Sequence, residues 1–297
     1  FHKDSISNML HQKCFVCNSP EIEELKGYEK HQMSQCRNCG FVFMSRIPSD
    51  AELQAHYGMY AYGTQQYLSP LTIESFNKLL DEFEKYRKTN LLLDVGCGQG
   101  WFLETAKKRG WVVYGTEFSE QAVKICTDKG IIMKQGVLNP SDFGDLKFDI
   151  IYSSEVLEHI NNPVPELTNM NKLLRSKGLL YLTTPNFNCY LRHKFKASYN
   201  IIEYPEHLSY YTPKTLHFVL NKTGFKKKKL LTTGISLTRA ENSSGKPAEK
   251  RSEASKDEQL RQLMSKNFLM KYIKSAVNTG LTITGLGITL KAYYEKV

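Results

Sequence analysis

Four cysteines near the start of the chain have a spacing that suits metal binding. Cys14 and Cys17 form one Cys-x-x-Cys pair, Cys36 and Cys39 form a second, and 18 residues separate the two pairs. Two such turns can hold four thiolates around one Zn²⁺ ion in tetrahedral geometry. Four sulfur ligands leave no coordination position for water or substrate, so we expect a structural zinc site that folds a small unit at 9–45. No neighbouring residue supports the alternatives, a thiol redox pair or an iron–sulfur cluster.

A glycine-rich segment further along the chain could hold a nucleotide-like ligand. Asp94–Gly100 reads Asp-Val-Gly-Cys-Gly-Gln-Gly and follows an apolar run. A glycine-rich turn between a strand and a helix lets a ligand approach the backbone closely. The dinucleotide fingerprint fails because Trp101 or Leu103 takes the place of its third glycine, and a triphosphate P-loop is excluded because no Gly-Lys-Ser/Thr is present. Glu117 ends the next expected strand, where a carboxylate can accept hydrogen bonds from both hydroxyls of a ribose.

Two histidines lie beside carboxylates and are candidate bases. His159 follows Glu155 and Glu158, and His207 follows Glu206. Histidine is the natural base near neutral pH, and general base catalysis contributes roughly 10²–10⁴-fold to a rate. The structural alternative is that His159 and Glu158 orient a turn after a strand, and that His207 is a hydrogen-bonded anchor of a loop.

The elements that must position these residues alternate in type from Leu91 onward. Short apolar runs predict strands and amphipathic segments between them predict helices, which is typical of an α/β fold built from βα units around a parallel sheet. Strands are expected at Leu91–Val95, Val112–Glu117, Phe148–Ser153, Leu179–Thr184, Phe225–Leu231 and Thr289–Glu295. Helices are expected at Leu71–Tyr86, Trp101–Arg109, Glu120–Lys129, Pro165–Arg175, from Pro213 to near Gly224, and from Glu258 to Val277. Residues 46–90 should form a tyrosine-rich connector that includes the first helix, and 238–258 a basic, mobile loop.

The positive charge of the chain is concentrated in one segment. Between Lys222 and Lys274 there are 14 Lys and Arg against 5 Asp and Glu, a net of +9 out of +10 for the whole chain. A nucleic-acid-binding protein usually spreads positive charge over a face of its folded body, so nucleic acid is an unfavoured partner. The segment is interpreted as a solvated insertion or as a contact for an anionic surface such as lipid headgroups.

Composition and cysteine count indicate the compartment. With 41% hydrophobic and 24% charged residues the sequence is typical of a globular protein. No apolar run reaches the roughly 18 residues of a transmembrane helix, and no secretory leader is recognisable. Seven cysteines, an odd number, do not suggest a disulfide framework. We therefore expect a cytoplasmic protein, with peripheral membrane contact as an open alternative.

These motifs together resemble those of the class I S-adenosylmethionine-dependent methyltransferases. The resemblance covers about 88–235 and rests on the glycine-rich segment, Glu117, Phe148–Ile160 and Gly178–Asn186 in family order. It implies a doubly wound, mostly parallel, Rossmann-like sheet of seven strands over 91–297, preceded by the small zinc-binding unit. It also implies that S-adenosylmethionine is the cofactor.

The resemblance further implies which residues hold that cofactor. Asp94 and the glycines would hold its methionine end and Glu117 its ribose. The full implied set is Asp94, Gly96, Cys97, Gly98, Gly100, Glu117, Phe118, Val137, Leu138 and Ser154. The acidic residue with which the family often contacts the adenine amine is missing after the third strand, and Asp142 or the backbone of Val137–Leu138 is expected to substitute.

Two further resemblances concern the methyl acceptor. The Glu-x-x-Glu-His segment ending at His159 is similar to one in ubiquinone-type O-methyltransferases, where it is associated with a divalent metal. The segment around Glu206–His207 resembles that of sugar C-methyltransferases, which act on nucleotide-linked keto-sugars and also begin with a four-cysteine zinc unit. Those enzymes carry an additional C-terminal domain, for which we expect no counterpart here. The simpler methyltransferases of glycan clusters share the segment without that domain.

The expected function follows from these resemblances. It is methyl transfer to a sugar, a nucleotide-linked sugar or another small hydroxylated acceptor, in surface glycan (polysaccharide) or secondary metabolite biosynthesis. The candidate catalytic residues are Glu155, His159, Glu206 and His207. Transfer to oxygen, carbon or nitrogen is left open. The alternatives are an RNA-binding methyltransferase and a membrane-peripheral protein that uses the basic segment.

Overall fold

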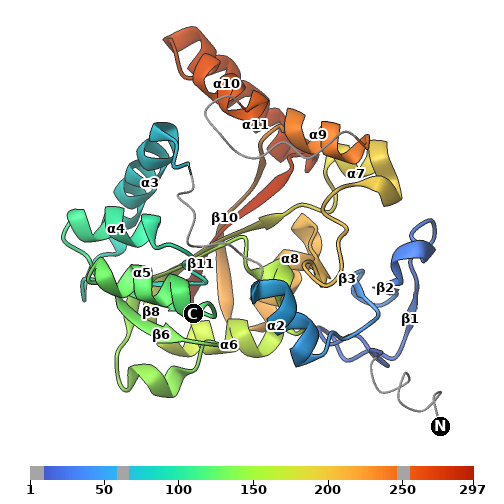
Figure 1. The fold of residues 1–297 in the computed structure, drawn as a ribbon, viewed down its shortest axis with the longest axis horizontal. Helices are drawn as coiled ribbons and strands as arrows, with labels where there is room; N and C mark the ends of the chain where they lie inside the picture. Colours follow the sequence, from blue (N-terminus) through green and yellow to red (C-terminus); the bar gives the residue numbers. More distant parts are fainter. Residues whose placement is uncertain (1–9, 59–66, 246–254) are drawn as a thin grey trace.

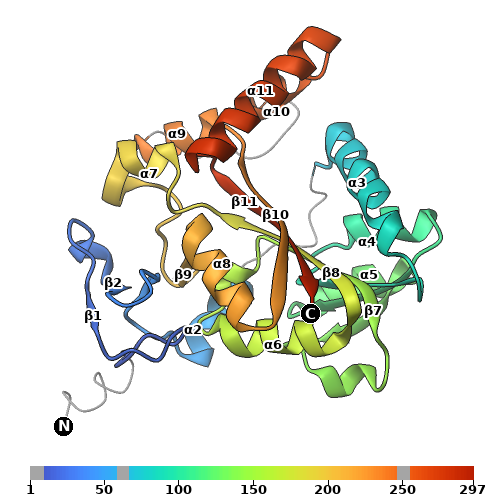
Figure 2. The same cartoon turned by 180° about the vertical axis from the view of Figure 1, so that it is seen from behind.

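A mixed sheet of seven strands forms the centre of the computed structural model, which describes residues 10–58, 67–245 and 255–297 (Figures 1 and 2). Its strand order is β10-β11-β8-β7-β4-β5-β6. The strands are β4 (Leu91–Val95), β5 (Val112–Glu117), β6 (Ile132–Gln135), β7 (Phe148–Ser154), β8 (Leu174–Pro185), β10 (Phe225–Thr233) and β11 (Thr289–Lys296). Strands β4 to β8 pair in parallel, and β11 runs antiparallel to both of its neighbours. The predicted α/β fold with a mostly parallel seven-stranded sheet is confirmed.

The path of the chain through this sheet reverses at its centre. From β4 the chain moves outward to β5 and β6, and it then returns to β7 on the other side of β4. In open α/β sheets, ligands bind outside the carboxyl ends of the strands at such a reversal point. The glycine-rich segment follows β4 and the Glu-x-x-Glu-His segment follows β7, so both lie at this edge.

Helices cover both faces of the sheet because successive strand residues point to opposite sides. Leu92, Tyr152 and Tyr181 face α3 (Pro70–Phe83) and α4 (Trp101–Lys108), and α5 (Glu120–Asp128) contributes Cys126 to the same core. On the other face, Leu93 and its neighbours pack with α6 (Pro163–Leu173) and α8 (Pro213–Lys222). The start of α8 was predicted correctly, since Thr212 caps it and Pro213 is its first residue.

The N-terminal unit is joined to the rest of the fold by a second sheet, which the sequence did not indicate. Strands β1 (Ile22–Glu24), β2 (Met33–Cys36) and β3 (Val42–Met44) form an antiparallel sheet, and β9 (Ser209–Tyr210) is its fourth strand. Val42 pairs with Tyr210 and Phe43 with Ser209. The unit is therefore fixed to the loop that carries His207.

The remaining helices are short or lie outside the two sheets. They are α2 (Asp50–Gly58), α7 (Tyr190–Phe195), α9 (Leu237–Ser243), α10 (Lys256–Leu263), α11 (Phe268–Thr284) and the 3₁₀ turns Glu29–His31, Glu84–Tyr86, Pro140–Phe143, Leu157–His159 and Lys196–Ser198. Helices α10 and α11 extend away from the body beyond β10 and β11 (Figures 1 and 2). Among the described residues no helix is long and apolar enough to span a membrane.

Two predictions for the C-terminal part need correction. The described parts of 238–258 are not a loop throughout, because α9 occupies 237–243 and α10 begins at Lys256. The helix expected from Glu258 to Val277 is interrupted before Phe268, where Asn267 Oδ1 accepts a 2.9 Å hydrogen bond from Met270 N and caps α11. Residues 246–254, and 59–66 of the tyrosine-rich connector, lie outside the described residues.

Candidate active site

The turn after β4 depends on glycine at two positions. Gly96 and Gly100 have φ values of +73° and +72°, in the left-handed region that other residues rarely adopt. A Cβ atom on Gly96 would lie 2.5 Å from Val156 Cγ2, and one on Gly100 would lie 2.8 Å from Cys126 Sγ. The turn therefore keeps its backbone open at the carboxyl edge of β4. Cys97, which was predicted to bind the cofactor, has its Sγ 4.0 Å from Cys126 Sγ, so its side chain packs inward.

Asp94 has the properties expected of a ligand-binding residue. Its side chain is buried, and its Oδ1 has no hydrogen-bond partner among the described residues. Burial raises the pKa of this carboxyl well above its usual range, and the neighbouring Cys126 and Glu117 add to the increase. Because an unpaired buried carboxylate is costly, a cationic donor such as an α-ammonium group would remove a large penalty.

Glu117 is held in place by backbone amides of two segments. Its Oε2 accepts a 2.9 Å hydrogen bond from Gly98 N, and its Oε1 accepts one of 2.8 Å from Phe118 N. The carboxylate is thereby fixed beside the glycine turn at the end of β5, and its remaining lone pairs can accept hydrogen bonds from ribose hydroxyls. Asp94 and Glu117 together fit the two ends of an aminoacyl nucleoside such as S-adenosylmethionine.

The predicted adenine contacts differ in their exposure. Phe118 and Val137 are 58% and 67% exposed, so they offer apolar surface at the ends of β5 and β6. Leu138 is instead a core residue, and its carbonyl oxygen already accepts a 3.1 Å hydrogen bond from Asn169 Nδ2. Asp142 is exposed in the following 3₁₀ turn. The adenine side of the site is the more open one.

His159, His207 and Glu158 form a compact group that we call the histidine cluster. The two imidazole rings have centroids 4.9 Å apart, and one ligand atom from each of the three residues lies within 4.8 Å of the others. His159 Nδ1 lies 2.7 Å from the Glu206 carbonyl oxygen and His207 Nδ1 lies 2.7 Å from that of Ile201. Because a carbonyl only accepts, each Nδ1 carries the proton and each Nε2 presents a lone pair.

The electrostatics of the cluster favour neutral imidazoles. Burial, followed by the charge of His159, lowers the pKa of His207 to about 4. Burial also lowers the pKa of His159, and it raises the pKa of Glu158 well above its usual range. Glu158 Oε1 lies 3.8 Å from His159 Nε2, while its Oε2 accepts a 2.8 Å hydrogen bond from Thr184 Oγ1. Glu206, which was predicted as a catalytic residue, contacts His159 through its backbone carbonyl oxygen.

Glu155 connects the end of β7 to a second set of polar residues. It is a non-glycine residue with φ +55°, and such backbone strain is concentrated at functional sites. Its Oε1 accepts a 2.9 Å hydrogen bond from Thr183 Oγ1, which lies 2.8 Å from Ser154 Oγ. Its Oε2 lies 3.9 Å from Arg239 Nη2. Arg239 was missed from the sequence because it falls in the stretch interpreted as a mobile loop.

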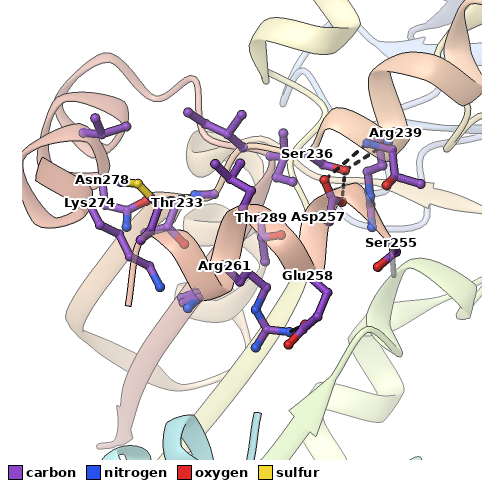
Figure 3. Close-up of a pocket in the computed structure, with 18 residues that line it drawn as sticks. Thr233, Ser236, Arg239, Ser255, Asp257, Glu258, Arg261, Lys274, Asn278 and Thr289 are labelled. Carbon is purple, nitrogen blue, oxygen red and sulfur yellow. Dashed lines mark hydrogen bonds and ion pairs between the residues drawn. The ribbon is translucent and has the colours of Figure 1, made fainter. Parts of the chain in front are cut away.

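Arg239 also lines a pocket of about 690 Å³ beside the sheet edge (Figure 3). The pocket lies among the ends of β10 and β11 and helices α9, α10 and α11. Its lining includes Ser236, Arg239, Asp257, Glu258, Arg261, Lys274, Asn278, Thr289 and Lys291. A volume in this range suits a small-molecule ligand. No motif in the sequence indicated this pocket, since its residues come from five separate elements.

The four N-terminal cysteines converge as predicted. Cys14 Sγ lies 3.7 Å from Cys39 Sγ, Cys17 Sγ lies 3.5 Å from Cys36 Sγ, and all four sulfur atoms lie within 4.8 Å of one another. Four sulfurs at tetrahedral Zn–S distances of about 2.3 Å would be about 3.8 Å apart. The arrangement fits Zn²⁺.

Comparison with known proteins identifies the family. The methyltransferase domain family matches residues 65–230, which is more than half of the chain, and the chain belongs to this family. The fold is that of S-adenosylmethionine-dependent methyltransferases of known structure.

Curated relatives match the central part of the chain. The ubiquinone biosynthesis O-methyltransferase of Coxiella burnetii is 30% identical over 141 residues, which cover 42% of this chain and 54% of that protein. The protein of the same name from Histophilus somni is 26% identical over 137 residues, which cover 42% and 55%. The chain thus spans about half the length of the curated relatives it matches.

Solved structures show the same fold at low identity. A SAM-dependent methyltransferase from Archaeoglobus fulgidus is 20% identical with a TM-score of 0.50, and the match covers 76% of this chain and 93% of that one. Phospholethanolamine N-methyltransferase 2 of Haemonchus contortus is 15% identical with a TM-score of 0.52, and the match covers 84% and 60%.

Proposed function

We propose that this protein transfers a methyl group from S-adenosylmethionine to a small hydroxylated acceptor, with a sugar or nucleotide-linked sugar as the favoured class. The observation that carries the proposal is the pairing of an unpartnered, buried Asp94 with a fixed Glu117 at the reversal point of the sheet. When bound there, S-adenosylmethionine supplies an electrophilic methyl group on a sulfonium. The protein's task is then to align the acceptor and remove its proton.

Residues at the carboxyl edge of the sheet bind the cofactor on one side and the acceptor on the other. Asp94 holds the ammonium end of the cofactor, and Glu117 holds the ribose. On the acceptor side, Nε2 of His159 or His207 takes the proton of an acceptor hydroxyl as the oxygen bonds to the methyl group. Glu158, whose Oε1 lies 3.8 Å from His159 Nε2, then stabilises the imidazolium. The Nδ1 hydrogen bonds to backbone carbonyls keep both rings in the required orientation.

A second role for the histidine cluster is favoured by its donor set. Two neutral imidazoles and one carboxylate form the three-ligand face that divalent transition metals accept, and each histidine has the backbone partner at Nδ1 that orients metal ligands. In that role a divalent metal would bind the acceptor hydroxyl and lower its pKa. Activity without added metal supports the base role, and activity that requires Mg²⁺ or Mn²⁺ supports the metal role.

Methyl transfer from labelled S-adenosylmethionine to a panel of sugars and nucleotide-linked sugars tests the proposed function. We expect transfer to at least one member and a loss of about 10²-fold or more in His207→Gln or His159→Gln. His193→Gln is the matched control, because His193 is exposed on α7 away from the cluster. The sugar class is contradicted if no member is methylated by a protein that binds the cofactor.

We also propose that the enzyme associates with anionic membrane surfaces through α11. Phe268 is 84% exposed at the start of this helix, and Leu269 and Tyr272 are exposed beside it. Lys271 and Lys274 are interspersed with these apolar side chains. Exposed aromatic residues alternating with lysines are typical of helices that lie in a lipid interface.

Another part of the basic segment has a structural explanation. Lys226–Lys229 occupy the exposed edge strand β10, where lysine prevents the addition of a further strand.

Vesicle sedimentation tests this association. We expect binding to vesicles that contain phosphatidylglycerol but not to those of phosphatidylcholine alone. The double substitution Phe268→Asp and Tyr272→Asp should reduce binding at least tenfold, whereas Ile283→Asp, at an equally exposed apolar residue near the other end of α11, should leave most of it. Equal sedimentation of both variants, or no sedimentation of the wild type, would contradict the proposal.

The alternative of RNA binding by the N-terminal unit gains no support from the structure, since Arg37 is paired with Glu23.

A further inference from the structure

The pocket in Figure 3 carries more positive charge than its own carboxylates neutralise. Its lining contains four cationic side chains, Arg239, Arg261, Lys274 and Lys291, and two acidic ones, Asp257 and Glu258. Figure 3 shows Arg239, Arg261 and Lys274 on three separate helices around the pocket. The charge available to a ligand depends on which of these side chains already form ion pairs or hydrogen bonds within the protein.

Both carboxylates of the pocket are used inside the protein. Asp257 Oδ2 accepts a 2.6 Å hydrogen bond from Ser236 Oγ, and its Oδ1 accepts one of 2.7 Å from Leu237 N at the start of α9. Glu258 is almost fully buried, accepts a hydrogen bond from Ser69 Oγ, and pairs at 2.9 Å with Arg261 Nη1. These two residues fasten α10 to α9 and α3, so they are not available to neutralise the lysines.

The two lysines lack such partners. Within the described parts of the chain, neither Lys274 Nζ nor Lys291 Nζ has a carboxylate within 4.0 Å or a hydrogen-bond acceptor in reach. Burial lowers the pKa of Lys291, and the charge of Lys274 lowers it further, so the two ammonium groups disfavour each other. Arg239 is partly engaged by Glu155, but its Nη1 is buried with no partner among these residues. Lys274, Lys291 and Arg239 thus line one cavity, and each has a donor atom without an acceptor among the described residues.

The sheet register places this cavity next to the reaction edge. Ser154 on β7 pairs with Thr183 on β8, and Thr183 pairs with Lys291 on β11, so the three side chains share one face. Two strand spacings separate Ser154 from Lys291, which is about 10 Å. An anionic group bound by Lys291 would therefore be about one monosaccharide away from an acceptor atom beside Ser154 or Glu155, whose Oε1 accepts a hydrogen bond from Thr183 Oγ1.

We propose that this pocket binds a phosphate or diphosphate group of the methyl acceptor, with Lys274, Lys291 and Arg239 as its ligands. This inference rests on the proposed function and narrows its substrate class to phosphorylated or nucleotide-linked acceptors. Donors from α9, α11 and β11 can surround a tetrahedral anion from several directions, which suits phosphate. The pocket would then select the acceptor by its charge, while the histidine cluster acts on its hydroxyl.

Calorimetric titration of the full chain with inorganic pyrophosphate tests this pocket. We expect saturable binding that weakens with added salt, and at least a tenfold loss of affinity in Lys291→Gln and in Lys274→Gln. Lys226→Gln is the matched control, because Lys226 is an exposed lysine on β10 outside the pocket. Thermal unfolding of each variant checks its fold. Because Lys274 is exposed, Lys274→Gln keeps the inference testable if Lys291→Gln does not fold.

The outcomes separate this inference from the proposed function. S-adenosylhomocysteine should bind wild type and Lys291→Gln equally, because Lys291 lies outside the cofactor residues. Cofactor binding without pyrophosphate binding would overturn the pocket assignment and leave the methyltransferase function intact. Tighter binding of malonate than of pyrophosphate, or an equal loss in Lys226→Gln, would overturn it as well. Loss of cofactor binding by the wild type would contradict the proposed function itself.

Discussion

At the scale of single residues, Asp94 shows how a functional position differs from a core position. Its neighbours on β4 are buried apolar side chains, whereas Asp94 is equally buried with an oxygen that has no partner among the described residues. A carboxylate in this state destabilises the protein without ligand and is retained because a bound cation repays the cost. This interpretation predicts that a single substitution of Asp94 changes folding stability and cofactor affinity in opposite directions.

Asp94→Asn should stabilise the ligand-free protein and weaken cofactor binding. The folded-state pKa of Asp94 lies above its ordinary value of 3.8, so its contribution to stability falls as the pH rises from about 4 through that higher pKa. The stability gain of the variant, on the order of 1 kcal/mol, should therefore be larger at pH 7 than at pH 4. Urea unfolding at the two pH values measures it, and an equal or smaller gain at pH 7 would refute the interpretation.

At the scale of elements, β9 is the link between the two sheets. It pairs with β3 of the N-terminal unit, and it begins two residues after His207. Leu208 N, between them, donates a 2.8 Å hydrogen bond to the Glu158 carbonyl oxygen. Folding of the cysteine unit and placement of the histidine cluster are therefore coupled through a two-residue strand. A structural zinc ion that takes no part in the chemistry would still influence the placement of the histidine cluster.

Removing the metal should loosen the segment that carries His207. Cys36→Ser should abolish bound zinc, measured by atomic emission, and increase amide hydrogen exchange of residues 201–211 tenfold or more. Cys126→Ala is the control, since it deletes a buried thiol outside the cysteine cluster. Unchanged exchange at 201–211 in the zinc-free variant would show that the two units are independent.

At the scale of the whole molecule, the sequence predicted what depends on local pattern. The strands from Leu91 to Glu117, the capped start of α8 and the convergence of the cysteines follow from apolar periodicity, capping residues and spacing. The doubly wound order and the cofactor residues came from resemblance, and the observed sheet agrees with the former.

What the sequence did not predict depends on contacts between distant segments. The pairing of β3 with β9 joins residues more than 160 positions apart, and two-residue strands have no periodicity to detect. Arg239 and Lys291 are ordinary polar residues until α9 and β11 bring them to one cavity. Polar composition at 238–258 indicated a loop, but Asp257 bonds to Leu237 N and fastens α10 to the start of α9.

The central claim is that Asp94, the glycine turn and Glu117 form an S-adenosylmethionine site. Calorimetry with S-adenosylhomocysteine should show saturable binding to the wild type and at least a tenfold weaker affinity for Glu117→Ala, equivalent to about 1.4 kcal/mol or more. Glu120→Ala, an exposed carboxylate three residues further on, should bind like the wild type. Equal affinity of all three proteins, or no binding to the wild type, would contradict the account.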